Sequence, residues 1–422
     1  MHVPAEQPFV PVVLGGDIGT YSLAREFHEA YGAVTVVVPA GPNGVIEHSV
    51  AIDLRPSGSV TDDETLLQHL LTLGADLTKE QQRPLLLLGS LDLHVTFLAR
   101  HKNRLEPLFT VPYPDEATIL AGALKQNFAE LCKELDLPTP FTLVIDPAGG
   151  TAQLPEDLPF PLIGKPADSS AWVGASFPGK RKVHTLADRA ELDELLDHLA
   201  GSGYTEPFIL QERIPGGDEQ MRLCTFFADH TGAVTFAGYG EVVVEEHSPK
   251  VLGNSAGIVT AQNPDVVEAG RKLLQRLGWR GFAMVDAKLD PRDGVVKLFE
   301  LNPRLGRNHY YLTAAGMNPV RFYVRDFLGT EYDDVRLPEA LAPRDAAGTQ
   351  VLAVEHLYTV LPHGLLKRFA RGEVGERARA LLKARKVSDP LRYRAERHPR
   401  RLAYIAMAHL NHRRKFKAFP PA

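Results

Sequence analysis

A strand–turn–strand pattern between residues 282 and 302 constrains the fold of this chain more than any other feature of the sequence. Two apolar, β-branched stretches flank Asp290-Pro-Arg-Asp-Gly294, whose Pro, Asp and Gly residues favour a tight turn. We therefore predict a β-hairpin centred near residue 292 or 293. Side chains alternate faces along a strand, so Asp286, Glu300 and Asn302 are expected on one face of this hairpin.

Three oxygen-bearing side chains on one face suit a magnesium ion. Mg²⁺ takes oxygen ligands and usually binds one or two protein carboxylates together with phosphate oxygens. Carboxylates that are crowded together without a cation would repel each other. Arg304 and Arg307 follow the second strand and could hold anionic oxygens. The alternative is an ordinary hairpin with solvated charges on its outer face.

Length and composition favour a globular protein of two or three domains. The chain has 422 residues, of which 44% are hydrophobic and 23% charged, and no apolar run is long enough to span a bilayer. Cys132 and Cys224 form no disulfide framework, which favours a reducing compartment. The first residues carry neither a basic nor an apolar region, so we expect no secretion signal and a cytoplasmic protein.

Charge is distributed very unevenly along the chain. The net charge is −5, yet residues 361–422 hold 17 Lys and Arg against four acidic residues. Residues 398–418 join an apolar helical stretch to basic clusters, so peripheral contact with an anionic membrane is one interpretation. The favoured alternative is a terminal helix packed on the acidic remainder. Nucleic-acid binding is not expected, because no stacking aromatics interleave the charges.

Residues 1–105 are predicted to form an α/β domain with a parallel sheet. Strand patterns at 9–14, 34–38 and 84–89 alternate with helical patterns at 21–31 and 64–73. The turn Gly15–Thr20 lacks the spacing of a dinucleotide-binding loop. The helix that begins near Asp17 could receive a substrate carboxylate at its N-terminus; a tight structural turn is the alternative.

Residues 106–330 are predicted to form an α+β domain. Strand patterns at 221–227, 234–240 and 241–246 mix with helical patterns at 186–199 and 265–277 and with the hairpin. A basic, mostly helical region, 331–422, follows. The fold class is thus α/β and α+β, with a parallel-sheet domain first and a helical extension last.

Lys165 ends an apolar strand and is a candidate phosphate-binding residue. The loop that follows, with Ser169, Ser170, Gly174 and Gly179, could close over a triphosphate through backbone N–H groups. Pro166 excludes the phosphate-binding loop of P-loop enzymes. A solvent-facing lysine beside a flexible loop is the alternative. Further along the chain, Gln211-Glu212 could bind a purine and Glu219 could bind a ribose. The alternative is that this segment is an exposed strand edge.

In their order along the chain, these elements resemble the ATP-grasp superfamily. The resemblance covers about residues 106–330 and implies that ATP and Mg²⁺, or Mn²⁺, are cofactors. It implies phosphate contacts by Lys125 and Lys165 with residues 167–180 as a lid, and a metal site formed by Asp286, Glu300 and Asn302. It also implies contacts to the adenosine part of ATP by Gln211, Glu212, Ile214 and Glu219. One departure is Leu124 before Lys125, where many relatives carry an acidic residue.

Within the superfamily, the segments 15–25 and 302–311 are similar to those of D-aspartate-ligase-like carboxylate–amine ligases. This resemblance implies that ATP phosphorylates an amino-acid carboxylate, with Arg304 beside the acyl phosphate. An amine, for example on a UDP-linked muramyl peptide of peptidoglycan synthesis, would then attack. Arg307, Arg222, Asn254 and Asp17 are candidate substrate residues, with a structural role favoured for Arg222 and Asn254. A phosphotransferase or a nucleotide-binding scaffold are the alternative functions.

Overall fold

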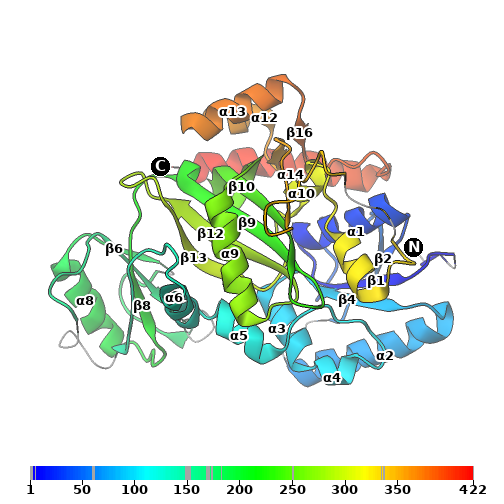
Figure 1. Ribbon diagram of the computed structural model, residues 1–422, viewed down its shortest axis with the longest axis horizontal. Coiled ribbons are helices and arrows are strands. Elements are labelled where there is room, and N and C mark those ends of the chain that lie inside the picture. Colours follow the sequence, from blue (N-terminus) through cyan, green and yellow to red (C-terminus); the bar gives the residue numbers. More distant parts are fainter. Residues whose placement is uncertain are drawn as a thin grey trace. The chain divides into compact units, whose positions relative to one another are not determined.

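The computed structural model describes residues 3–4, 6–58, 62–147, 154–167, 172, 174–181, 183–249, 251–333, 335 and 338–421. The chain forms two compact units (Figure 1). Unit 1 comprises Met1–Ile119, Gly217–Asp286 and Asn302–Ala422, and unit 2 comprises Leu120–Gly216 and Ala287–Leu301. The division into domains at 1–105, 106–330 and 331–422 stays a prediction.

The first sheet of unit 1 is parallel, as predicted. It has the strand order β3-β2-β1-β4, with β1 Val10–Leu14, β2 Thr35–Val38, β3 Ile52–Leu54 and β4 Leu85–Gly89. β1, β2 and β4 are buried along their whole length, which explains their unbroken apolar sequences. The helices of this region are α1 Ile18–Tyr31, α2 Asp63–Gln81, α3 Asp92–Arg100 and α4 Lys102–Leu105.

The large sheet has the strand order β13-β12-β9-β10-β11-β15-β16, with β14 beside β10. Its strands are β9 Met221–Ala228, β10 Val234–Glu246, β11 Asn254–Ala261, β12 Gly281–Leu289, β13 Val296–Asn302, β14 Gln350–Val351, β15 Leu357–Thr359 and β16 Val387–Ser388. The prediction of two strands at 234–246 was wrong. β10 is a single strand with register shifts near Val244, because a bulge bends the ladder without ending it.

The predicted hairpin is confirmed. β12 and β13 are neighbours, and Gly294 has a φ of 75°, which glycine adopts without strain. In the turn the Asp290 N–H donates to the Val295 carbonyl at 2.9 Å, and the Gly294 N–H donates to the Asp290 carbonyl at 2.8 Å. The turn residues thus close the loop through local hydrogen bonds, as their sequence requires.

The Asp290 side chain stabilises this turn. It is fully buried and accepts hydrogen bonds from the Arg292 N–H at 3.0 Å and from Lys297 Nζ at 2.6 Å. Hydrogen bonds from Arg292, joined by Lys297 and opposed by burial, hold the pKa of Asp290 well below its usual range. This stabilisation is complete above the pKa of an unfolded Asp and is lost as the pH falls towards the depressed folded value.

We expect Asp290→Ala to lower the free energy of unfolding of unit 2 by about 1–3 kcal/mol, because Lys297 and the Arg292 N–H lose their acceptor. Urea denaturation at pH 7 followed by circular dichroism measures the change. Glu156→Ala is the control, since Glu156 is an exposed carboxylate elsewhere in unit 2. Equal stability of the two variants would contradict this role.

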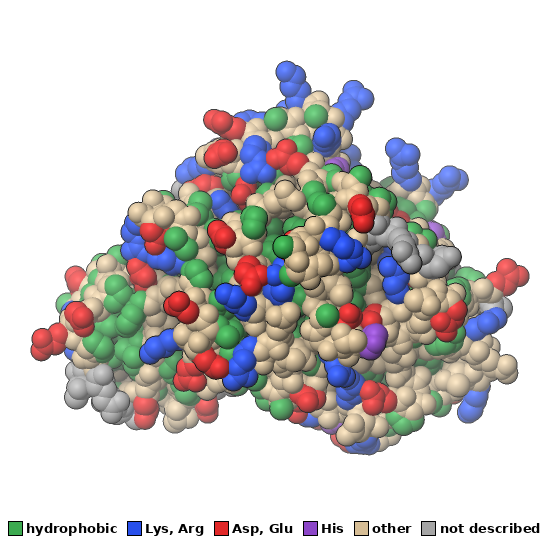
Figure 2. Space-filling model, in the orientation of Figure 1, with side chains coloured by type: hydrophobic (Ala, Val, Ile, Leu, Met, Phe, Trp, Pro, Cys, Tyr) green, Lys and Arg blue, Asp and Glu red, His purple; other side chains and the backbone are tan. Residues whose placement is uncertain are grey.

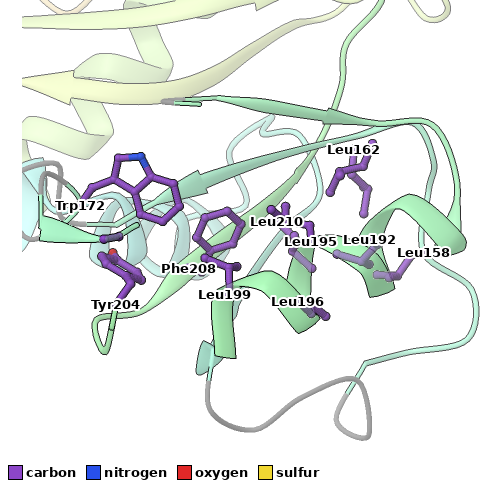
Figure 3. Packing of buried hydrophobic residues seen from close by; sticks show 12 residues of the cluster. Leu158, Leu162, Trp172, Leu192, Leu195, Leu196, Leu199, Tyr204, Phe208 and Leu210 are labelled. Carbon is purple, nitrogen blue, oxygen red and sulfur yellow. The ribbon is translucent and has the colours of Figure 1, made fainter. Parts of the chain in front are cut away.

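The sheet of unit 2 is antiparallel, with the order β5-β8-β6-β7. Its strands are β5 Thr142–Ile145, β6 Leu162–Pro166, β7 His184–Leu186 and β8 Phe208–Glu212. Figure 3 shows leucines of α8 (Arg189–Ala200) packed with Phe208, Leu210 and Trp172 in one apolar cluster. The other helices of this part of the chain are α5 Glu116–Ala123, which starts in unit 1, and α6 Lys125–Glu134.

The basic C-terminal region ends in helices, as predicted, but strands and irregular segments make up much of it, and it adds β14, β15 and β16 to the large sheet. Its helices are α12 His363–Phe369, α13 Gly372–Lys383 and α14 Pro399–Ala418; unit 1 also contains α9 Pro264–Leu277, α10 Tyr310–Ala314 and α11 Val320–Tyr323. Figure 2 shows Lys and Arg side chains projecting at the end of the molecule that carries α12 and α13. No helix among the described residues is long and apolar enough to cross a membrane.

Candidate functional site

A cavity of about 270 Å³ in unit 1 brings together five residues that the sequence singled out. Its volume is just below the usual range of small-molecule sites, which suits an amino acid better than a large ligand. The walls come from β11, β12, the segment that follows β13, and α14. The five predicted residues that line it are Asn254, Asp286, Asn302, Arg304 and Arg307.

Asp286 and Asn302 face each other across neighbouring strands. The Asn302 amide nitrogen donates to the Asp286 carboxylate at 2.8 Å. An amide can turn over to present its oxygen, so this pair fits a hard cation. Among the described residues, no group of three or more His, Cys, Asp and Glu side chains is placed to hold a metal ion. A cation in this cavity would therefore need an amide or phosphate oxygens as well as carboxylates.

Arg304 and Arg307 follow β13 directly and line the cavity with positive charge. Arg304 Nε lies 2.9 Å from the carboxylate of Asp92, and Arg307 Nε lies 3.5 Å from that of Asp17. Arg307 is about one third exposed, so it can still reach a ligand. Both guanidinium groups are thus held by acidic partners while they face the cavity, which is suited to anionic groups.

Asp17 has a second structural role at the start of α1. Its carboxylate accepts a hydrogen bond from the Thr20 N–H at 3.0 Å and caps the helix. The predicted N-terminal carboxylate site thus already contains a protein carboxylate. Asp17 is not among the residues that line the cavity, but it contacts Arg307, which does line it.

Arg222 and Glu219 do not line this cavity. Arg222 is 7% exposed and donates to the backbone carbonyls of Glu219 and Met221 at 2.7 and 2.9 Å. These bonds agree with the structural role that the sequence favoured for Arg222. The Glu219 carboxylate accepts the Gly217 N–H at 3.1 Å. Asn254, for which a structural role was also favoured, does line the cavity and donates to the Val251 carbonyl at 2.8 Å.

Unit 2 brings together the predicted phosphate-binding residues. Lys125 Nζ lies 3.1 Å from the Glu300 carboxylate, and Lys165 Nζ donates to the Gln211 side-chain oxygen at 3.0 Å. Lys125, Lys165 and Gln211 also line one small cavity. Burial, strengthened by Lys125 and opposed by Glu300, lowers the pKa of Lys165 to about 8. An anion that replaced Gln211, the neutral partner of Lys165, would favour the charged form of this lysine.

Glu212 and Ile214 lie at the end of β8 and just beyond it. The Glu212 carboxylate forms an ion pair with Arg292 at 2.6 Å, and the Ile214 carbonyl accepts from Lys288 Nζ at 2.9 Å. Both contacts fasten this segment to the hairpin. The proposed lid falls partly outside the described residues, which include Gly174 and Gly179 but not Ser169 and Ser170.

The sequence did not identify the contribution of α14 to the unit 1 cavity. Tyr404, Ala408, Asn411 and Lys415 line it, and their spacing of four, three and four residues places them on one helical face. That spacing was visible in the sequence, but no motif connected it to the cavity. The cavity is also lined by three residues that the sequence did not single out: Glu246 at the end of β10, Asn308, and His412 of α14.

Solved structures with the same arrangement identify the fold. An L-amino acid ligase from Bacillus licheniformis matches with a TM-score of 0.55 at 16% identity, covering 78% of this chain and 77% of that one. The biotin carboxylase of Campylobacter jejuni, in a β,γ-ATP complex, matches with a TM-score of 0.58 at 13% identity, covering 84% and 75%. No protein-family model matches the chain. The chain therefore has the ATP-grasp fold, and it is similar to ATP-dependent carboxylate–amine ligases.

Within that class, the chain is similar over nearly its whole length to one curated relative. It is 28% identical over 429 residues to D-aspartate ligase of Enterococcus faecium (strain Aus0004). The match covers 99% of this chain and 98% of the relative, so it includes α14 as well as the ATP-grasp elements.

Proposed function

We propose that this protein joins the carboxylate of a small amino acid, aspartate in the first instance, to an amine through an acyl-phosphate intermediate. The observation that carries the proposal is the unit 1 cavity, which combines Arg304 and Arg307 with Asp286 and has the volume of an amino-acid site. The full-length similarity to a D-aspartate ligase supports the same chemistry.

ATP would be held chiefly by residues of unit 2. Lys125 and Lys165 would bind its phosphates, exchanging Glu300 and Gln211 for phosphate oxygens. Gln211, Glu212 and Ile214 at the end of β8 would contact the adenine, and Glu219 the ribose. These assignments rest on the order of the elements along the chain and on the cluster of lysines.

Asp286, Glu300 and Asn302 would hold Mg²⁺, with Mn²⁺ as a substitute, because their carboxylate and amide oxygens are the donors that a hard cation prefers. When bound, the ion supplies positive charge that offsets the charge of the triphosphate.

The reaction has two steps. A carboxylate oxygen of the amino acid attacks the γ-phosphorus of ATP and ADP leaves, which produces an acyl phosphate. The amine then attacks the acyl carbon, phosphate leaves and the amine loses a proton, so that an amide forms. Arg304 would stabilise the charge on the acyl phosphate, and Arg307 would orient the amino acid. No covalent bond to the protein is needed.

The amine acceptor is proposed to be a stem peptide of a peptidoglycan precursor, for example a UDP-linked muramyl pentapeptide. The unit 1 cavity is too small for such a molecule, so only its reacting amine would enter. We expect the protein to act in the cytoplasm. Membrane contact by the C-terminal region is the less favoured alternative, because α14 packs on unit 1 through buried Arg401, His412 and Phe416.

One incubation tests the proposal. The protein is mixed with Mg-ATP, D- or L-aspartate, other amino acids and the UDP-linked pentapeptide, and products are followed by mass spectrometry and ADP release. We expect a pentapeptide adduct whose mass equals the sum of the two substrates less one water. ADP release should require both substrates.

Other outcomes would replace the proposal. A stable phosphorylated small molecule that forms without an amine would indicate a phosphotransferase. If no ADP appears with any substrate, a nucleotide-binding scaffold is indicated. Pelleting of the full chain with anionic liposomes would support the membrane alternative for the tail.

Arg307→Ala should raise the KM for the amino acid by about tenfold or more while the KM for ATP changes little, because a charge-assisted hydrogen bond to a carboxylate is lost. Steady-state kinetics with each substrate varied in turn measure both constants. Arg83→Ala, at an exposed position of unit 1, is the control. An unchanged amino-acid KM would remove Arg307 from the substrate site.

A further inference from the structure

The C-terminal helix α14 forms one wall of the unit 1 cavity. Tyr404, Ala408, Asn411 and Lys415 share the face that lines it. The same helix was the candidate for membrane contact because of its basic clusters. Because Lys415 lies on the cavity face of α14, its ammonium group can contact a ligand bound in the cavity.

Buried contacts hold α14 in this orientation. Arg401 is fully buried, donates to the carbonyls of Gly44 and Val45 at 3.0 and 2.6 Å, and lies 4.0 Å from the ring centre of Tyr21. A Cβ atom on Gly44 would come within 2.4 Å of the Tyr404 ring, so only glycine allows this close approach. The cavity face of α14 is therefore a fixed part of unit 1.

An ion pair on the cavity wall joins α14 to the large sheet. Lys415 Nζ lies 3.1 Å from the Glu246 carboxylate, and Glu246 is 5% exposed while Lys415 is partly exposed. Nearby, His412 is 9% exposed, and its Nδ1 has no hydrogen-bond partner among the described residues. Lys415 can thus turn towards a ligand, while Glu246 stays in place as a buried negative charge.

The charges on the cavity wall define the ligand that suits it. Arg304, Arg307 and Lys415 line the cavity with positive charge, and Glu246 and Asp286 line it with negative charge. Asp92 and Asp17, which do not line it, pair with the two arginines. Arg304 and Arg307 follow β13, whereas Lys415 lies near the C-terminus, on α14. One carboxylate of a ligand could meet the arginines, and a second could meet Lys415. An ammonium group would then pair with Glu246.

We propose that the Lys415–Glu246 pair selects the amino-acid substrate by binding the groups that do not react. Lys415 binds a second carboxylate, and Glu246 binds the ammonium group. The substrate class is thus an amino acid with two carboxylates, of which only one is activated. This inference rests on the proposed function and adds to it a specificity-determining residue outside the ATP-grasp elements.

Substrate preference of the full-length protein tests the assignment. ADP release is measured with aspartate, asparagine and alanine, each as both enantiomers, for wild type, Lys415→Gln and Lys415→Arg. We expect Lys415→Gln to lower the preference for aspartate over asparagine about 10- to 100-fold, because one charge-assisted contact is lost. Lys415→Arg should retain most of the preference, and the KM for ATP should change little in both variants.

Lys417→Gln is the matched control, an exposed lysine two residues along the same helix. Equal effects of Lys415→Gln and Lys417→Gln in an active enzyme would overturn the inference and leave the proposed function intact. If wild type releases no ADP with any amino acid, the proposed function fails. The assignment of Lys415 is then tested separately by the change in Tm when aspartate is added. A rise in Tm that is lost in Lys415→Gln sustains the assignment, and no rise in wild type overturns it.

Discussion

Lys165→Met is expected to lower kcat/KM for ATP by about 10²–10³-fold, the usual cost of removing one preorganised group that stabilises charge in a reaction. Lys165 lies near the end of β6, lines the small cavity of unit 2 with Lys125, and already donates to Gln211. Methionine keeps the length of the side chain and removes its charge. Initial rates of ADP release with varied ATP measure the loss.

The reaction of wild type should also depend on pH through Lys165. Burial lowers its pKa to about 8, so the side chain is charged below that pH and becomes neutral above it. A neutral amine cannot neutralise phosphate. Since kcat/KM reports ionisation of the free enzyme, this constant for ATP should fall about tenfold per pH unit above pH 8.

Two variants separate this role from a general effect on stability. Lys165→Arg stays charged across the whole range, so whatever activity it retains should not fall above pH 8. Lys133→Met, at an exposed position of α6, should behave as wild type. If kcat/KM of wild type is level from pH 7 to pH 9.5, Lys165 does not bind phosphate as a charged group.

The sequence predicted those parts of the fold that are encoded locally. The turn Asp290–Gly294 and its flanking strands were predictable because Pro, Asp and Gly restrict the backbone within a few residues. The buried strands β1, β2 and β4 were predictable for a similar reason, since unbroken apolar runs between helical patterns indicate a parallel sheet. The lysines and Gln211 were linked by their order along the chain, and unit 2 brings them together.

Other parts depend on contacts between distant segments. The short strands β15 and β16 contain three and two residues, too few for a period to be recognised. β15 forms because β11 supplies a partner, and β16 forms because β15 does. The bulge in β10 interrupts the regular pairing, and the sequence pattern therefore predicted two strands where the structure has one. The cavity face of α14 was in the sequence as a helical spacing, but nothing local distinguishes it from a solvent-exposed face. The sequence did not identify Glu246, because its partner Lys415 lies far away in the sequence and no local pattern connects the two residues.

One buried carboxylate connects the C-terminal region to the first sheet. Glu396 is 5% exposed and accepts hydrogen bonds from Tyr21 Oη at 3.2 Å, Ser49 Oγ at 2.6 Å and the Val50 N–H at 3.1 Å. Arg401 Nε lies 4.0 Å from the same carboxylate. Glu396 therefore fixes the start of α14 against elements that are hundreds of residues away in the sequence.

Glu396→Ala should lower the free energy of unfolding of unit 1 by about 3–5 kcal/mol, because it leaves the charge of Arg401 buried without its nearest carboxylate. It should also raise the KM for the amino acid more than that for ATP, since α14 carries Lys415 into the cavity. Urea denaturation and steady-state kinetics measure the two effects. Glu373→Ala, an exposed carboxylate in the first turn of α13, should cost less than about 1 kcal/mol.

The two readouts of Glu396→Ala distinguish a packed helix from a membrane anchor. If α14 were held by lipid in the working enzyme, the loss of Glu396 would leave the amino-acid KM unchanged in the absence of membranes. A helix that forms a wall of the substrate site must lose affinity together with stability, because the same contacts that bury Arg401 also orient Tyr404 and Lys415. Loss of stability with an unchanged amino-acid KM would therefore contradict the substrate role of α14.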